Sequence, residues 1–366
     1  MSKNVIRVLV VDDSALLREI LSDIIENAEG LAVAGTARDG EDALEKIAKL
    51  KPDIVTLDVQ MPRMDGMATL DAILKTNPIP VIMVSAVTQR AAGITLQALE
   101  RGALDYITKP ENFKSTSTAF SDELLQKIHN MAGTDVQRVL RIRKSRTQRS
   151  VSKVNAISKA TASPEGLYED CCIALGISTG GPPALTGLFQ LLEPPLPAIA
   201  IVQHMPAQFT GPFAARLDAI SQLTVKEAKT GDVMQPNHVL IAPGGKHLYL
   251  RRQGSRVIAR VRDGDQVSGH KPSVNVMMHC ATEIYQNRCL GIIMTGMGHD
   301  GAEGCGEIRS AGGYVLGQDE LTSDVYGMNK VAFTQGHVDQ QFSIDDLPLL
   351  VSQQCKNMFE LESLKV

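Results

Sequence analysis

In the N-terminal third of the chain, short apolar runs alternate with longer stretches whose apolar positions recur at helical spacing. Short apolar runs bounded by turn residues predict buried strands, and the helical spacing predicts helices with one apolar face. Ala15–Ala28 is one such predicted helix, since Ser14 can cap its start and Gly30 follows its end. Five strand–helix repeats predict an α/β fold with a doubly wound, five-stranded parallel sheet. The predicted strands are Ile6–Val11, Leu31–Ala37, Ile54–Leu57, Val81–Val84 and Asp105–Ile107.

A second α/β pattern begins at Cys171. Its apolar runs predict a mainly parallel sheet, with strands at Cys172–Ile177, Ala198–Gln203, Val239–Ala242, Leu290–Met294 and Tyr314–Leu316. Two further apolar runs, Leu248–Arg252 and Val257–Val261, flank Gly254 and Ser255. Because glycine readily adopts the positive φ of a tight turn, these two runs predict a β-hairpin.

The composition changes between the two patterns. From Val136 to Pro164 the chain carries Arg and Lys residues interleaved with Ser and Thr, and no Asp or Glu. We interpret this segment as a solvated linker that charge repulsion keeps extended. A nucleic-acid-binding patch is the alternative, but no aromatic side chain is present to stack on bases. The predicted organisation is a first domain over residues 1–130, a basic linker over 131–165 and a second domain over 166–360.

Bulk composition is that of a soluble two-domain protein. The chain has 366 residues and a formal charge of −4, which gives no indication of nucleic-acid or membrane binding. No apolar run approaches the roughly 20 residues that span a bilayer, and the first residues lack the pattern of a signal peptide. The six cysteines include no Cys-x-x-Cys pair, so we expect reduced, mostly buried thiols. These features favour a cytoplasmic location.

Polar side chains follow four of the predicted N-terminal strands. Asp12 and Asp13 follow the first strand, Asp58 the third, Ser85 the fourth and Lys109 the fifth. Parallel strands bring such residues to one edge of the sheet. Three carboxylates that repel each other favour a hard dication such as Mg²⁺, and a nearby lysine and hydroxyl suit a phosphoryl group.

These residues, together with the segment Met61-Pro-Arg-Met-Asp-Gly66 and Lys109-Pro110, resemble the receiver domain of response regulators, which has a flavodoxin-like fold. The resemblance implies that Asp58 accepts a phosphoryl group from a histidine kinase. It also implies that Asp13, Asp58 and the backbone carbonyl of Gln60 hold Mg²⁺ with help from Asp12. By the same resemblance Ser85 and Tyr106 form the switch and Lys109 contacts the phosphate. The Lys109–Pro110 bond is a candidate cis peptide.

A serine lies at the end of a strand in the second domain. Ser178 stands in Gly176-Ile-Ser-Thr-Gly180, between a predicted strand and a helix that starts at Gly181-Pro-Pro. A serine on such a turn can act as a nucleophile. A phosphate-binding turn or a plain glycine-rich connection is at least as probable for this pattern taken alone.

Two further strand ends favour the nucleophile. His204 follows the next strand, and Asp300 follows the strand that ends near Thr295. Serine, histidine and aspartate then meet at one edge of a sheet, as nucleophile, base and orienting acid require. Their order along the chain differs from that of α/β-hydrolases, which disfavours that fold. Among the other histidines only His270 is expected to line this pocket, and no histidine spacing indicates a catalytic metal.

The second domain resembles the catalytic domain of chemotaxis protein-glutamate methylesterases, and with the receiver the resemblance covers nearly the whole chain. The resemblance implies that Ser178, His204 and Asp300 form the catalytic triad, with Thr179 and the N–H of Met297 at the oxyanion and substrate pocket. It implies phosphorylation-activated hydrolysis of glutamate methyl esters on chemoreceptors, with deamidation of glutamines, Mg²⁺ only in the receiver and no cofactor for the esterase. The motifs that carry it are Gly176–Gly181, His204-Met-Pro206, Ile241–Gly245, His270–Val274 and Thr295–Gly301.

Four positions depart from the family pattern: Ile177, Asn275, His299 and Asn329 stand where alanine, aspartate, asparagine and proline are usual. None belongs to the implied triad. Two rival functions are a response regulator that binds DNA without catalysis and a hydrolase of small esters. The size of the second domain and its lack of a basic recognition helix count against the first.

Overall fold

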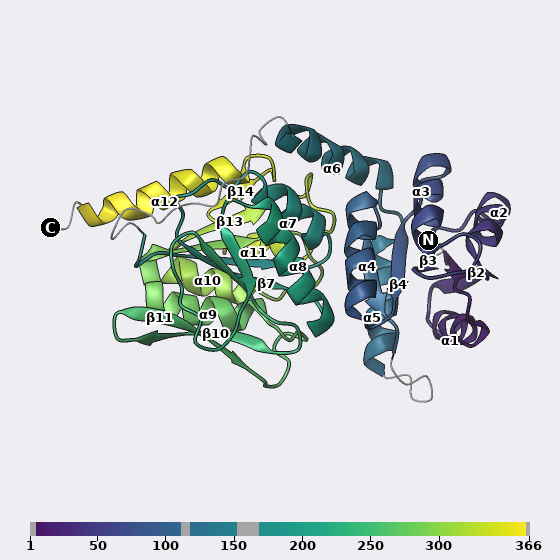
Figure 1. Ribbon diagram of the computed structural model, residues 1–366, viewed down its shortest axis with the longest axis horizontal. Helices are drawn as coiled ribbons and strands as arrows, with labels where there is room; N and C mark the ends of the chain where they lie inside the picture. The colour runs from purple at the N-terminus through teal and green to yellow at the C-terminus, as the bar shows by residue number, and fades with distance from the viewer. Residues whose placement is uncertain (1–4, 111–117, 152–167, 364–366) are drawn as a thin grey trace. The chain divides into compact units, whose positions relative to one another are not determined.

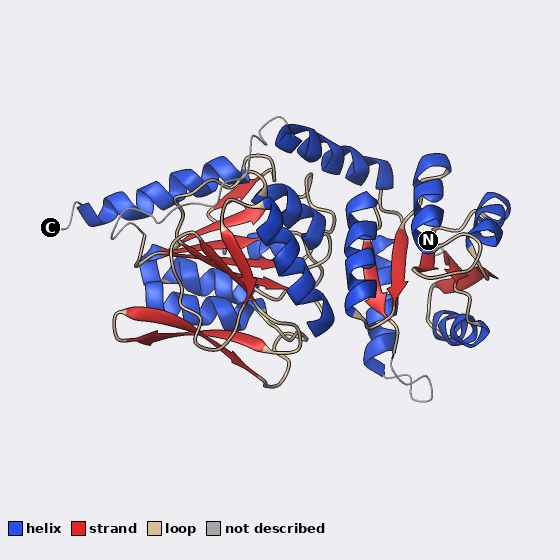
Figure 2. Cartoon of the chain, viewed as in Figure 1, coloured by secondary structure: helices blue, strands red, loops and turns tan. Residues whose placement is uncertain are grey.

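The computed structural model describes residues 5–110, 118–151 and 168–363. By its internal contacts the chain divides into two compact units, Met1–Arg141 and Ile142–Val366. Figure 1 labels the elements, and Figure 2 shows that each unit combines parallel strands with surrounding helices. The α/β class predicted for both parts of the chain is confirmed.

The first unit is a five-stranded, fully parallel sheet with strand order β2-β1-β3-β4-β5. Helices α1 and α5 pack on one face through a core that includes Leu17, Leu21 and Leu124, while α2 contacts α3 and α3 contacts α4 on the other. This order confirms the doubly wound sheet. The strands are β1 Ile6–Val11, β2 Leu31–Ala37, β3 Ile54–Asp58, β4 Val81–Ser85 and β5 Asp105–Thr108, and the helices are α1 Ala15–Glu26, α2 Gly40–Leu50, α3 Gly66–Thr76, α4 Gln89–Arg101 and α5 Thr118–Met131.

The linker prediction is wrong for its first half, because Val136–Val151 form helix α6. Val136 and Val139 are buried in the core of the first unit at a spacing of one turn. Asp135 caps the helix by accepting a hydrogen bond from the N–H of Arg138 at 2.9 Å. Arg, Lys and Gln are good helix formers, so the charges do not prevent the helix. Residues 152–165 of the predicted linker lie outside the described residues.

The second unit is built on a seven-stranded parallel sheet with strand order β14-β13-β12-β6-β7-β9-β8. Strand β6 therefore lies between β12 and β7, the strands that precede Asp300 and His204. Two short strands at the sheet edges, β8 and β14, were not predicted. The strands are β6 Cys172–Ile177, β7 Ala198–Gln203, β8 Thr224–Glu227, β9 His238–Ile241, β12 Cys289–Ile293, β13 Tyr314–Gln318 and β14 Gln340–Phe342.

The predicted hairpin is confirmed as an antiparallel ribbon of β10 (His247–Gln253) and β11 (Arg256–Arg262), with Gly254 in the left-handed region at its turn. Helix α9 lies between this ribbon and the sheet, since it contacts β6 and β7 as well as β10 (Figure 1). One apolar core thus includes residues of the sheet, α9 and the ribbon. The helices are α7 Gly181–Phe189, α8 Ala207–Ile220, α9 Val274–Tyr285, α10 Ala302–Ser310, α11 Met328–Thr334 and α12 Leu347–Ser363, with a 3₁₀ turn at Gln286–Arg288.

Three smaller predictions concern the cysteines, a cis peptide bond and membrane-spanning helices. All six cysteines are free, and all but Cys280 are buried, as expected. The cis assignment for Lys109–Pro110 is wrong, since the cis bonds of the described residues are Pro194–Pro195 and Lys271–Pro272. Within the described ranges, no helix combines the length and apolar character needed to cross a membrane.

Gly244 packs closely against the loop that follows β7, and a substitution at this position tests that packing. A Cβ at this position would lie 2.4 Å from backbone atoms of Met205, Pro206 and Ala207. We expect Gly244→Ala to lower the free energy of unfolding of the intact chain by about 1–3 kcal/mol in urea titrations. Gly93→Ala is the control, because its Cβ would meet nothing within 4 Å and the residue lies within α4. The control should gain about 0.5–1 kcal/mol, and equal stabilities of the two variants would contradict this account.

Candidate phosphorylation and catalytic sites

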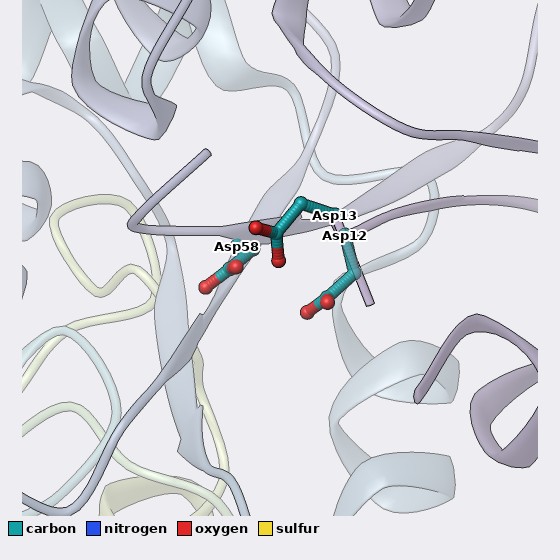
Figure 3. Close-up of side chains that lie close together, drawn as sticks. All are labelled: Asp12, Asp13 and Asp58. Carbon is teal, nitrogen blue, oxygen red and sulfur yellow. The ribbon is translucent and has the colours of Figure 1, made fainter. Parts of the chain in front are cut away.

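Three carboxylates converge where β1 and β3 end in the first unit. Asp12 and Asp13 follow β1, and Asp58 is the last residue of β3. Their nearest oxygens all lie within 4.8 Å of one another (Figure 3). Asp12 and Asp58 are buried, whereas Asp13 is exposed. Carboxylate oxygens at this spacing, with one open side, are a donor set that suits a hard divalent cation.

Lys109 joins the two buried carboxylates. Its Nζ lies 2.9 Å from an oxygen of Asp12 and 2.9 Å from an oxygen of Asp58. Burial and the negative charge of Asp12 nevertheless raise the pKa of Asp58 to about 6, against the opposing effect of Lys109. The cluster therefore holds more negative charge than its lysine offsets, which again favours a cation.

The predicted switch residues lie at the same edge of the sheet or just beside it. The Ser85 hydroxyl is buried at the end of β4 and accepts a hydrogen bond of 2.7 Å from Thr95 of α4. Tyr106 is buried in β5, with Lys127 positioned 5.3 Å from its ring centre. Gln60 lies beside Asp58, to which its N–H donates at 3.4 Å. A cleft of about 610 Å³ opens there, lined in part by Asp13, Gln60, Met61 and Arg90.

The turn that carries Ser178 connects β6 to α7. The Ser178 N–H donates to the carbonyl of Thr295, and the Ser178 carbonyl accepts from the N–H of Gly181 at 2.8 Å. Gly180 is the N-cap residue of α7 and has a φ of 80°. This left-handed conformation is unfavourable for residues that carry a side chain. The turn thus presents Ser178 at the N-terminus of a helix, where backbone N–H groups favour negative charge.

His204 follows β7, next to the turn that carries Ser178. Its N–H donates to the carbonyl of Ile177 at 3.2 Å, and its Nε2 lies 2.9 Å from a carboxylate oxygen of Asp300. An ionised carboxylate only accepts hydrogen bonds, so Nε2 carries the proton and Nδ1 holds the lone pair. The Nδ1 atom is buried and has no hydrogen-bond partner among the residues that the structure describes. It can therefore accept a proton from a group that enters the site.

Four donors surround the carboxylate of Asp300, which is fully buried. One oxygen accepts from His204 and from the N–H of Val274, and the other accepts from the hydroxyl of Ser273 and the N–H of Asn275. Burial alone would raise the pKa of Asp300. The hydrogen bond and charge of His204 and the two backbone N–H groups outweigh it and hold this pKa below its ordinary value. Asp300 is thus stabilised as an anion at the N-terminus of α9.

The two residues expected at the oxyanion and substrate pocket lie beside Ser178. Thr179 is buried, and its carbonyl accepts a hydrogen bond of 2.9 Å from the hydroxyl of Thr295. Met297 is half-buried and follows Gly296, where a Cβ would lie 2.7 Å from Cβ of Ser178. The loop after β12 therefore approaches the serine closely.

Several supporting residues were not predicted from the sequence. The Gln203 amide donates to the carbonyls of Ser178 and His204 and so links the two loops. His247 accepts from the N–H of Ser273 and contacts the carbonyl of Asp265. Ser273 precedes an apolar run and caps α9, a sequence signal that could have been read. No such signal exists for His247.

Comparisons with known proteins identify the family of each unit. The CheB methylesterase family matches residues 173–351, and the response regulator receiver domain matches residues 8–120. A protein-glutamate methylesterase/protein-glutamine glutaminase from Treponema denticola is 41% identical over 363 residues, which cover 95% of this chain and 98% of that protein. The chain belongs to this family.

Two further relatives illustrate the extent of the likeness. A protein of the same description from Geobacter metallireducens is 40% identical over 351 residues, or 95% of each chain. The crystal structure of the Thermotoga maritima CheB methylesterase catalytic domain is 37% identical, covers 50% of this chain and 96% of that chain, and aligns with a TM-score of 0.49. The family models and the curated relatives confirm the resemblance inferred from the sequence motifs.

The four departures from the methylesterase pattern have defined surroundings. Ile177 is buried and His299 is exposed. The side-chain oxygen of Asn275 accepts from the N–H groups of Gly301 and Gly304, and thereby caps α10, whose own N-cap residue is glycine. Asn329 donates to the carbonyl of Gln318 and the hydroxyl of Ser323. Asn275 is therefore the departure that directly supports the loop carrying Asp300.

His270 stacks on His204. The two rings are 3.8 Å apart between centroids and within 7° of parallel. His270 follows Ser268 and Gly269 in a loop held by Lys271, whose Nζ donates to Asp263 and to the carbonyl of Gly264. The stack fixes the plane of the His204 ring and covers one of its faces. His270 therefore lies against the candidate base, where the sequence motifs led us to expect it.

The acidic cluster of the receiver leads to a prediction about stability. The unfolded chain has an ordinary Asp pKa of about 4, whereas Asp58 in the folded receiver has a pKa of about 6. Ionised Asp58 therefore destabilises the metal-free receiver above about pH 6, and this destabilisation disappears below about pH 4. We expect Asp58→Asn to raise its free energy of unfolding at pH 7.5 by roughly 1–2 kcal/mol, allowing for solvent screening.

Amide hydrogen exchange of receiver peptides in the intact chain, with EDTA present, measures this change. The gain should shrink as the pH is lowered toward 4. A variant that is less stable than the parent protein at pH 7.5 would show that Lys109 overcompensates the cluster.

The stacked histidines lead to a prediction about catalysis. His270→Ala should lower kcat for ester hydrolysis roughly tenfold or more, because the His204 ring loses the contact that orients it. His270→Phe keeps a flat ring in the same place and should recover most of that loss, without a change in KM. His299→Ala, at the exposed neighbour of Asp300, is the control and should keep the parent kcat. If Phe were as damaging as Ala, a nitrogen of His270 rather than its stacked ring would be required.

Proposed function

We propose that the chain is a phosphorylation-activated protein-glutamate methylesterase that acts on chemoreceptors and also deamidates receptor glutamines. The observation that carries the proposal is the hydrogen bond between the buried Asp300 and His204, beside the Ser178 turn. Asp300 follows β12, Ser178 follows β6 and His204 follows β7, and these three strands are adjacent in the sheet. Family membership supplies the substrate class, since the relatives are described as protein-glutamate methylesterase/protein-glutamine glutaminase.

Ester hydrolysis then proceeds in two stages. The Ser178 hydroxyl attacks the γ-carbonyl carbon of the methyl ester while Nδ1 of His204 takes the hydroxyl proton. The tetrahedral intermediate expels methoxide, which receives that proton from His204 and leaves as methanol. Water next gives one proton to His204 and its hydroxyl attacks the acyl–serine ester. Ser178 leaves and takes that proton back from His204, and the glutamic acid released ionises to the carboxylate by losing its proton to solvent. With a glutamine substrate the first leaving group is ammonia.

Charge stabilisation follows from the surroundings of the three residues. Asp300 favours the imidazolium form of His204 in each proton transfer, and its four donors keep it ionised. The N–H of Met297 is proposed as the oxyanion donor, with Thr179 lining the pocket. Such a donor contributes about 3 kcal/mol to the stabilisation of the transition state. No metal takes part in this scheme.

Regulation is assigned to the receiver. We propose that Asp58 accepts the phosphoryl group of a histidine kinase. Asp13, Asp58 and the carbonyl of Gln60, assisted by Asp12, would hold Mg²⁺, which would neutralise the phosphoryl oxygens. Lys109 already bridges Asp12 and Asp58 and would contact the phosphate.

In the proposed scheme, Ser85 and Tyr106 form the switch that responds to phosphorylation of Asp58. A phosphoryl group that recruits the Ser85 hydroxyl competes with its hydrogen bond from Thr95 and so changes a contact with α4. Tyr106 would respond from the neighbouring strand β5. A cytoplasmic location accords with a kinase phosphodonor and a substrate on the cytoplasmic part of a receptor.

The assignment of Ser178 is tested by Ser178→Ala. Methanol release from methylated receptor membranes should fall by more than about a thousandfold, because the nucleophile is lost. Phosphate incorporation at Asp58 should be unchanged. Asp58→Asn is the reciprocal control, which should abolish phosphate incorporation and the stimulation by a phosphodonor while basal methanol release remains.

Parallel assays with p-nitrophenyl acetate separate the proposed activity from general esterase activity. A receptor-specific enzyme should prefer the methylated receptor strongly. Retained hydrolysis in Ser178→Ala, or a preference for the small ester, would refute the corresponding part of the proposal.

A further inference from the structure

The ribbon formed by β10 and β11 concentrates positive charge in an otherwise acidic chain. Residues 246–262 contain six Lys or Arg residues and no Asp or Glu, whereas the whole chain has a formal charge of −4. A local excess of this kind in a two-stranded element creates a positive potential over one part of the surface. The charged residues are Lys246, Arg251, Arg252, Arg256, Arg260 and Arg262.

The pairing register separates the ribbon into two faces. Residues that lie directly opposite each other in an antiparallel pair share a face. The pairs Leu248–Val261 and Leu250–Ala259 face α9 and belong to the apolar core or pack against it. The opposite face and the tip carry the arginines of the ribbon except Arg252, which pairs with Val257 on the side of α9. The pairs on that face are Tyr249–Arg260, Arg251–Ile258, Gln253–Arg256 and His247–Arg262.

Intramolecular partners do not explain these charges. Arg252 lies 3.8 Å from Asp170 and is the member of the group that forms an ion pair. Arg251, Arg256 and Arg262 are exposed, and none forms an ion pair with another residue of the described segments. The Nε atom of Arg260 is buried yet has no hydrogen-bond partner within the same described segments. The exposed guanidinium groups of Arg251, Arg256 and Arg262 are therefore open to an external acceptor.

Both strands of the ribbon lead to the catalytic residues. At the start of β10, His247 accepts from the N–H of Ser273, whose hydroxyl donates to Asp300. After the end of β11, the loop carries His270, which stacks on His204. Each strand has seven residues, which corresponds to a reach of about 23 Å. The ribbon therefore starts beside the proposed active site and extends away from it.

We propose that this ribbon is a docking surface for the acidic polypeptide face that surrounds the substrate ester. The proposal rests on the function proposed above. Hydrolysis converts a neutral ester into a carboxylate, so a substrate with several such glutamates carries negative charge around each remaining ester. Guanidinium groups bind carboxylates with paired hydrogen bonds, and the exposed arginines are placed to meet them.

Two other anionic partners fit the surface less well. The tip, Gln253-Gly254-Ser255-Arg256, holds no apolar side chain that could enter a membrane interface. Tyr249 is the single aromatic residue of the ribbon, so the ribbon lacks the series of rings on which nucleic-acid bases stack.

The test compares two double variants that remove the same charge from the intact chain. Arg251→Gln/Arg256→Gln removes two exposed arginines of the ribbon, and neither arginine faces α9. Lys330→Gln/Lys356→Gln removes two exposed lysines of α11 and α12. The first measurement is KM and kcat for methanol release from methylated receptor membranes at low and high salt. The second is co-sedimentation with the same membranes, with receptor-free anionic phospholipid vesicles and with duplex DNA.

We expect the ribbon variant to raise KM about threefold to tenfold at low salt and to leave kcat unchanged. The difference should shrink at high salt, where exposed charges are screened. Co-sedimentation with receptor membranes should fall in parallel, and hydrolysis of p-nitrophenyl acetate should match that of the parent protein. The lysine variant should retain the parent KM, which separates docking from an effect of net charge.

Three results would overturn the docking surface. They are an unchanged KM and unchanged co-sedimentation of the ribbon variant, an equal effect of the lysine variant, and a loss confined to receptor-free vesicles or DNA. Failure of the proposed function looks different, since the parent chain would then release no methanol. Loss of receptor co-sedimentation in the ribbon variant would support the docking surface even in that case.

Discussion

Parallel strands must all end at the same edge of their sheet, and both candidate sites depend on this constraint. In the receiver it brings Asp12, Asp58 and Lys109 together from β1, β3 and the end of β5. In the second unit it brings the ends of β12, β6 and β7 side by side. Residues separated by about a hundred positions thereby become neighbours without any dedicated scaffold. Helices pack on both sheets and the hairpin packs on α9, while the loops that follow the strand ends carry the site residues.

Two buried aspartates, one from each site, show how the surroundings decide the charge state of the same type of side chain. Asp300 receives four hydrogen-bond donors and its pKa is held low, so its charge is already balanced within the fold. Asp58 faces Asp12, and its pKa is raised to about 6 despite Lys109. The first arrangement suits a permanent anion that orients a base. The second leaves excess negative charge, which a divalent cation relieves before a phosphoryl group arrives.

The elements that position the sites were predictable because their signals are local. Strands β6 and β7 are continuous apolar runs that end at a glycine-rich turn or at His204, and both were predicted with the bounds observed. Edge strands β8 and β14 were missed because they have four and three residues, too few for a periodic signal. Helix α6 was missed because its charge suggested an extended chain, whereas Val136 and Val139 bury one side of it. The Gln203 and His247 contacts join residues from separate elements, and no local pattern encodes them.

The loop between β11 and α9 connects the arginine-rich ribbon to the proposed catalytic residues. It begins at Arg262, the last residue of the ribbon, carries His270 against His204, and ends at Ser273, which holds Asp300. Docking on the arginines would therefore hold a substrate beside the segment that orients both the base and its acid. Because that segment is already fixed by its own contacts, docking would change the affinity for the substrate and leave the orientation of the His204 ring as it is. One continuous segment thus joins the proposed docking ribbon to the residues that orient the catalytic base. Its two ends are fixed by the ribbon and by α9.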